Sequence, residues 1–274
     1  MNSIKHNLKE SSPALFEALR SGRDALIRMG ELPSMVFHPW RLNSNQRLKN
    51  YQNLYSGKRC FVIGNGPSLK NTNLSLIKDE FTFGMNRIYL AFEEWGFQTS
   101  FLVSVNDLVI EQCHSDFNDL KIPKFFSWHS KDLLFPGSQP DFNTHFLYTT
   151  YTGPKFNNLI THRFWEGATV TYVCLQLAFC MGFSEVYLIG VDHSFDTKGK
   201  ANQTIVSNGD DPNHFSPEYF GKGFRWQLPD LDTSERAYYT ANSAYLAAGR
   251  QVFDATVGGK LTVFPKVDYR SIFG

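Results

Sequence analysis

The stretch CFVIGNGPSLKNTNL, residues 60–74, decides the fold class. Its first four residues are apolar and suit a buried β-strand, and the turn residues Gly-Asn-Gly-Pro-Ser follow at once. Pro67 and the residues after it predict the start of a short helix. A buried strand that runs through a glycine-rich turn into a helix is typical of a parallel α/β sheet.

Strands and helices continue to alternate after this unit. Strands are predicted at 81–86, 100–107 and 124–128, and a helix is predicted at 88–96, where a glycine ends it. Residues 130–160 are rich in Pro, Gly, Asn and Thr, which predicts an irregular lid or insertion.

The clearest unit is EGATVTYVCLQLAFCMGFSEVYLIGVD, residues 166–192. Its first part is apolar on nearly every side and predicts a helix buried between layers, which Gly182 ends. The continuous apolar run at 185–191 predicts a parallel strand covered on both faces. A second unit has a helix from about Ser234, then Gly249 and a strand near Val252. Residues 51–274 therefore predict an α/β fold with a doubly wound, mostly parallel, Rossmann-like sheet.

Residues 1–50 predict an N-terminal helical extension. Its main helix follows Ser12-Pro13 and is expected to end at Gly30. It suits an arm packed on the main domain or a contact with another subunit, and no chemistry is expected from it.

Composition narrows the class of protein. The 274 residues are 42% hydrophobic and 19% charged, with a net charge of +1, as in a globular protein with a large core. Near-neutral charge argues against nucleic-acid binding. The four cysteines form no CxxC pair, which predicts free thiols in a reducing compartment. With no signal peptide or membrane span expected, we predict a cytoplasmic protein, while peripheral membrane association and oligomerisation stay open.

Polar residues cluster where the predicted strands end, at the edge where open parallel sheets bind ligands. The turn with Gly64, Asn65, Gly66 and Ser68 would bring backbone amides close to a phosphate at a helix N-terminus. Asn86 and Asn106 end the next two strands, and their amides suit sugar hydroxyls and phosphate oxygens. A ligand-free strand-to-helix turn explains the glycines about equally well, since neither GxGxxG nor a Walker motif is present.

Two histidines are candidates for a general base. Asp192 and His193 follow each other at the end of a strand, where both are candidates for catalysis, although a turn cap with a packed imidazole explains this pair equally well. His214 lies in a loop of aromatic and basic residues, in which Lys222 and Arg225 would neutralise phosphate charge. The alternative is a surface loop held by aromatic packing. Asp230 and Asp232 match the DxD spelling of metal-dependent glycosyltransferases, but acidic residues also cap helices, and no metal site is assigned.

The motifs IGNGPSLK, a strand ending in MN, SVND, and the unit at 166–192 resemble the 6-hydroxymethylpterin diphosphokinase MptE-like family, which includes the motility accessory factor proteins. They are also similar to a bacterial sialyltransferase family that uses CMP-sialic acid. The resemblance spans roughly residues 58–270. It implies nucleotide contacts from the six strand-end residues above and from Gly167 and Thr169, and it places a catalytic base at His214.

The favoured hypothesis is a transferase, specifically a nucleotide-sugar glycosyltransferase, with a CMP-sugar as the candidate donor, in bacterial surface-polysaccharide or glycoprotein biosynthesis. It requires no cofactor, and its partners are a nucleotide-sugar donor and a glycan or protein acceptor. The first alternative is an ATP-dependent diphosphokinase with Mg²⁺ on Asp107, Asp192 or Asp230. The second is a non-catalytic nucleotide-binding scaffold.

Overall fold

The computed structural model describes residues 12–151, 153–197 and 199–274. Its centre is an eight-stranded sheet in the order β10-β7-β1-β2-β3-β4-β5-β6. Every neighbouring pair in this sheet is parallel. The strands are β1 (Arg59–Ile63), β2 (Phe81–Met85), β3 (Phe101–Ser104), β4 (Lys124–Ser127), β5 (Thr144–Thr150), β6 (Arg163–Trp165), β7 (Glu185–Ile189) and β10 (Gln251–Asp254).

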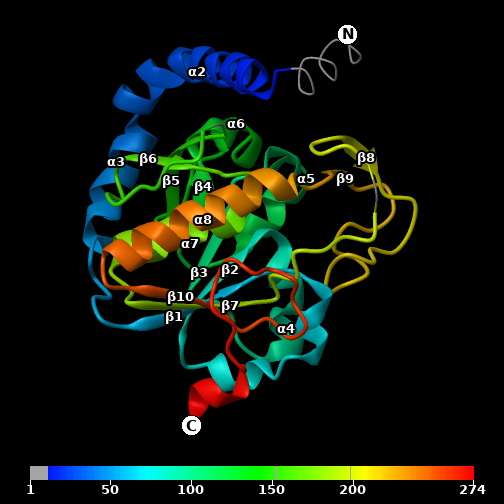
Figure 1. Cartoon of the computed structure of the whole chain (residues 1–274). Coiled ribbons are helices and arrows are strands. Elements are labelled where there is room, and N and C mark those ends of the chain that lie inside the picture. The colour runs from blue at the N-terminus through cyan, green and yellow to red at the C-terminus, as the bar shows by residue number, and fades with distance from the viewer. Residues whose placement is uncertain (1–11, 152, 198) are drawn as a thin grey trace.

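Helices cover both faces of the sheet, which confirms the doubly wound fold. One face packs against α7 (Val170–Met181) and α8 (Leu231–Ala247), which lie in front of the strands in Figure 1. The other packs against α5 (Asp107–Asp119) and the short helices η3 (Leu74–Ile77), η4 (Asn86–Ala91), α4 (Phe92–Trp95) and α6 (Lys131–Leu134). Burial on both faces explains why β1 and β7 at the centre of the sheet are nearly continuous apolar runs.

The order of the strands reverses direction at β1. The chain adds β2 to β6 on one side of β1 and then places β7 and β10 on the other. Ligands of open α/β sheets bind beyond the carboxyl ends of the strands at such a reversal. The ends of β1 and β7 are therefore where this fold predicts a site.

Two expectations are wrong. Residues 130–160 are not an irregular insertion, because they contain α6 and β5, and every residue of β5 is buried. The N-terminal helix does not end at Gly30, since α2 (Pro13–Phe37) continues through it. A glycine inside a helix costs only about 1 kcal/mol, which tertiary contacts can offset.

The N-terminal helices lie against the domain in different ways. In Figure 1, α2 crosses the top of the molecule and α3 (Pro39–Leu48) descends beside the sheet. The Ser44 hydroxyl of α3 donates to the Phe146 carbonyl of β5, and Leu48 is fully buried in the core. Helix α2 contacts the domain through polar groups such as Asp24 and Arg28, and Met35 packs against the core. The remaining elements are η1 (Lys49–Tyr51), η2 (Pro67–Asn71), η5 (Trp128–Ser130), η6 (Arg270–Phe273) and the antiparallel pair β8 (Thr204–Val206) and β9 (Arg225–Gln227).

The four cysteines are free and buried, and burial raises the pKa of the Cys174 and Cys180 thiols. Across the described ranges, no helix has both the length and the apolar character needed to cross a bilayer.

Candidate functional site

A cavity of about 250 Å³ opens beyond the carboxyl ends of β1, β2, β3 and β7. The loop between β7 and α8 and the start of α7 complete its walls. Nine of the residues predicted from the sequence line it: Gly64, Asn65, Gly66, Asn86, Asn106, Thr169, Asp192, His193 and His214. Segments far apart in the sequence thus meet at one edge of the sheet.

Four other predicted residues lie outside the lining: Ser68, Gly167, Lys222 and Arg225. Lys222 is exposed, and Arg225 forms an ion pair with Glu111 at 3.0 Å. The hypothesis that these two cations neutralise a phosphate has no support from their positions.

The glycine turn does not offer free amides as the sequence suggested. The Gly64 and Gly66 amides donate to the carbonyls of Ile189 and Gly190, at 2.8 and 2.9 Å. The Ser68 amide and hydroxyl donate to the Asp192 carboxylate, at 3.2 and 2.7 Å. In this conformation the amides of Gly64, Gly66 and Ser68 are therefore engaged within the protein, so a phosphate contact through them would require a different conformation.

The glycines are needed for close packing instead. A Cβ atom on Gly66 would lie 1.7 Å from Oδ2 of Asp192, and one on Gly64 would lie 2.2 Å from the Gly190 carbonyl oxygen. The turn after β1 is thus fastened to the end of β7. Burial raises the pKa of Asp192 although Ser68 hydrogen-bonds to it, and this role is structural.

Three longer helices begin at the cavity. The capping residues of α5, α7 and α8 are Asn106, Thr169 and Asp230, and all three line it. Each cap accepts a hydrogen bond from a backbone amide of its own helix. Helix N-termini carry a partial positive charge, so their convergence favours an anionic group in the cavity.

Asn106 and Asp230 therefore act first as helix caps. Asp107 accepts hydrogen bonds from His129 and Ser130. In the parts of the chain that the structure describes, no three His, Cys, Asp or Glu side chains are arranged to hold a metal ion. Of the aspartates considered for Mg²⁺, Asp192 and Asp230 line the cavity and Asp107 does not, and each of the three accepts hydrogen bonds from the protein.

Backbone strain is concentrated at the cavity. Five described residues other than glycine have positive φ, and four of them line the cavity: Asn86, Ala168, His193 and Asn202. Such conformations cost about 1–3 kcal/mol each and persist where the surrounding structure imposes them, commonly at functional sites. Ala168 follows Gly167, also at positive φ, and together they turn the chain from β6 into the start of α7.

His214 is the best oriented imidazole of the cavity. Its Nδ1 lies 2.7 Å from Oδ2 of Asp211, whose side chain is 1% exposed. Asp211 also accepts from the amides of Asn213 and Phe220, so Nδ1 carries the proton that it donates. The ring stacks on Tyr219 with centroids 4.1 Å apart. Nε2 is left with its lone pair, as a general base requires.

His193 is the second imidazole of the cavity. Its ring packs edge-on against Tyr238, with centroids 6.0 Å apart, and burial lowers its pKa. A lowered pKa keeps this histidine neutral at pH 7. Both histidines therefore stay candidates, but only His214 has a carboxylate that fixes its tautomer.

Two acidic residues of the site were missed from the sequence. Asp211 orients His214, and its position three residues earlier in the loop was the available signal. Glu166 lines the cavity just before the start of α7, and burial raises its pKa. It lies 3.8 Å from Arg28 of α2, a contact that no local pattern could indicate.

Comparison with known proteins gives the family. The model of the family "6-hydroxymethylpterin diphosphokinase MptE-like" matches residues 40–198, more than half of the chain. The chain belongs to the MptE-like family. The MptE-like match begins within the predicted N-terminal extension, at α3, and runs past the end of β7.

No curated protein matches the sequence. A solved structure that is similar is that of the MAf glycosyltransferase from Magnetospirillum magneticum AMB-1, with 16% sequence identity and a TM-score of 0.48. The similarity covers 85% of this chain and 39% of the solved one. This MptE-like chain thus spans well under half the length of that protein.

Proposed function

We propose that the protein is a nucleotide-sugar glycosyltransferase whose general base is His214. The observation that carries the proposal is the Asp211–His214 pair, which faces a cavity where three helices begin. The chain belongs to a family named for a diphosphokinase, and that name agrees with a phosphate-bearing substrate.

The proposed reaction uses His214 as its base. Nε2 of His214 takes the proton of an acceptor hydroxyl while that oxygen forms a bond to the anomeric carbon of the donor sugar. The bond between the anomeric carbon and the phosphate oxygen breaks, and the electron pair leaves with the nucleotide phosphate. Asp211 holds the imidazole in the required tautomer and stabilises the imidazolium that forms.

The leaving phosphate is assigned to the start of α7. Thr169, Val170 and Thr171 all line the cavity, and α7 is a 12-residue helix with its positive end there. Charge that develops on the leaving oxygen would be stabilised by this dipole. The glycine turn supports the site by fastening β1 to β7 and not by binding the phosphate itself.

The test is release of nucleotide from a panel of CMP-, UDP- and GDP-sugars, with EDTA present and with a mixture of acceptor glycans. We expect at least one donor to react, and His214→Ala to lower the rate by about 10²–10⁴-fold, the usual contribution of a general base. Nucleotide binding should stay unchanged in this variant.

His193→Ala is the matched variant, because it removes the other imidazole of the same cavity. An equal loss in both variants would show that His214 has no special role. Unchanged activity in both, with nucleotide still bound, would favour a scaffold. Strict dependence on ATP and Mg²⁺ would favour the diphosphokinase and contradict the proposal.

A further inference from the structure

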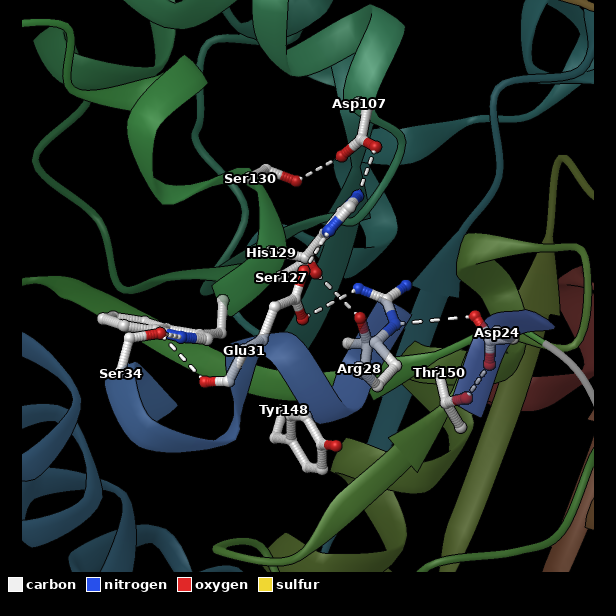
Figure 2. Close-up of polar contacts among 12 residues, drawn as sticks. Asp24, Arg28, Glu31, Ser34, Asp107, Ser127, His129, Ser130, Tyr148 and Thr150 are labelled. Carbon is white, nitrogen blue, oxygen red and sulfur yellow. Dashed lines mark hydrogen bonds and ion pairs between the residues drawn. The ribbon is translucent and has the colours of Figure 1, made fainter. Parts of the chain in front are cut away.

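Helix α2 turns its polar side toward the domain. Figure 2 shows Arg28 between Asp24 and Glu31, and His129 between Glu31 and Asp107. Arg28 is 7% exposed and also reaches Glu166 of the cavity. Asp24 accepts from the Thr150 hydroxyl at the end of β5. Charged contacts therefore fix this face of α2 against the domain.

The opposite side of α2 is apolar and faces solvent. We call it the α2 seam. Its large members are between 37% and 75% exposed: Leu15, Leu19, Leu26, Met29, Leu32, Val36 and Phe37. A helix that turns Asp24, Arg28 and Glu31 toward the domain and leucines toward solvent is the reverse of the usual surface helix. Contiguous exposed apolar surface of this kind marks an interaction site.

The spacing of the seam indicates what covers it. Positions 15, 19, 22, 26, 29, 33 and 36 alternate four- and three-residue steps, the heptad spacing of helices that pair along their length. Gly22 and Pro33 occupy two of these positions, and large apolar residues occupy the other five. A partner with a seam of the same period, such as α2 itself, would match it.

We infer that the protein forms a homodimer in which the α2 seams of two copies pack together. The 25 residues of α2 span about 37 Å. From their exposed fractions, the seven large side chains offer roughly 600–800 Å² per copy, near the ~800 Å² per partner of a standard stable interface. The area is thus large enough for a stable dimer.

Two other possible partners of the α2 seam, a lipid surface and residues 1–11, fit it less well. A helix that binds a lipid surface has a polar face rich in Lys and Arg at the level of the headgroups, but the polar face of α2 is turned into the domain. Residues 1–11, which precede α2, carry three large apolar side chains, Met1, Ile4 and Leu8. That is too little apolar surface to cover seven exposed side chains.

The test is the solution mass of the full chain by light scattering at about 50 µM, a concentration at which an interface of this size is expected to be occupied. We expect twice the 31.4 kDa of one chain. The double variant Leu26→Glu/Met29→Glu should be monomeric, because it places two charges in the middle of the seam and leaves the buried face of α2 intact. Leu246→Glu, 55% exposed on α8, is the control and should stay dimeric.

An engineered cysteine tests directly whether the two α2 seams touch. Leu26 lies near the middle of the seam, so it would approach its own copy whether the two helices run parallel or antiparallel. All four native cysteines are buried, so Leu26→Cys should give a covalent dimer on mild oxidation, and Leu246→Cys should not. A monomeric wild type would overturn the inference, as would a dimer that survives the double variant. Co-sedimentation of the wild type with phosphatidylcholine–phosphatidylglycerol vesicles, lost in the double variant, would assign the seam to lipid instead.

Discussion

Substitution of His129 by Gln should loosen α2 in a pH-dependent way. Both ring nitrogens of His129 lie 2.7 Å from a carboxylate oxygen, one on Glu31 of α2 and one on Asp107 of α5. Two carboxylates can both accept only if both nitrogens donate, so the ring is an imidazolium. The hydrogen bond to Asp107, and then that to Glu31, raise the pKa of His129 to about 9 against the opposing effect of burial. A glutamine in its place would be neutral and could bond only one carboxylate well.

The magnitude follows from the pKa. A rise from 6.5 to about 9 corresponds to roughly 2.5 kcal/mol at pH 7. His129 is 30% exposed and Asp107 43% exposed, so screening reduces this to about 1–2 kcal/mol. Because the pKa of the folded state is the higher one, this stability is fully present below pH 6.5 and is lost as the pH rises through 9.

The assay is thermal unfolding of wild type and His129→Gln at pH 7 and pH 10. At pH 7 the variant should melt roughly 2–8 °C lower, and at pH 10 most of the difference should vanish. Limited trypsin digestion at pH 7 should cut the variant faster at Arg20, Arg23 or Arg28 of α2. Exposed His162→Gln is the control and should change neither measurement. An equal difference at both pH values would refute the charged role of His129.

Two further predictions concern the cavity. Gly66→Ala should lower the free energy of unfolding by about 1–3 kcal/mol, because the new methyl group would overlap the Asp192 carboxylate. The control is Gly30→Ala inside α2, where nothing lies within 4 Å of the new methyl group; it should raise the free energy of unfolding by about 0.5–1 kcal/mol. Denaturant titration measures both variants, and equal changes in their free energies of unfolding would contradict the packing argument. Asp211→Asn should lower kcat on the reactive nucleotide sugar by about 10–100-fold while the dissociation constant of the nucleotide stays within about twofold. Unchanged turnover would show that Asp211 does not orient the base.

The fold was predictable where local pattern and burial agree. The strands at β1, β2, β3 and β7 are apolar runs that end in turn residues, and Gly182 ends α7 with φ of 97°. The strand β5 was missed because its sequence, THFLYTT, is half polar. Its polar side chains can be buried because other elements supply partners: Thr149 hydrogen-bonds to Ser127 of β4, and Thr150 donates to Asp24 of helix α2. A pattern within the strand contains no sign of that helix.

The location of the site could be predicted from the sequence, but the contacts between its residues could not. Strand ends indicated the cavity, and most of the predicted residues line it. The carboxylate that accepts a hydrogen bond from the Ser68 amide belongs to Asp192, 124 residues away along the chain. The partners of Arg28 and Glu31 on the main domain are as remote, so α2 offered no chemical signal in the sequence. Such pairings depend on tertiary structure and not on spacing.

We propose that the cavity holds a nucleotide with its phosphate at the start of α7. Titration calorimetry of the full chain with CMP, CDP, UDP, GDP and ATP, each with and without Mg²⁺, tests it most directly. Val170→Asp adds a negative charge at the first residue of α7, where the helix dipole tolerates it, and Val170→Asn is its neutral counterpart. We predict that at least one nucleotide binds, and that Val170→Asp weakens it at least about tenfold more than Val170→Asn does, equivalent to about 1.4 kcal/mol. No heat with any nucleotide, or equal binding by the two variants, would contradict the account.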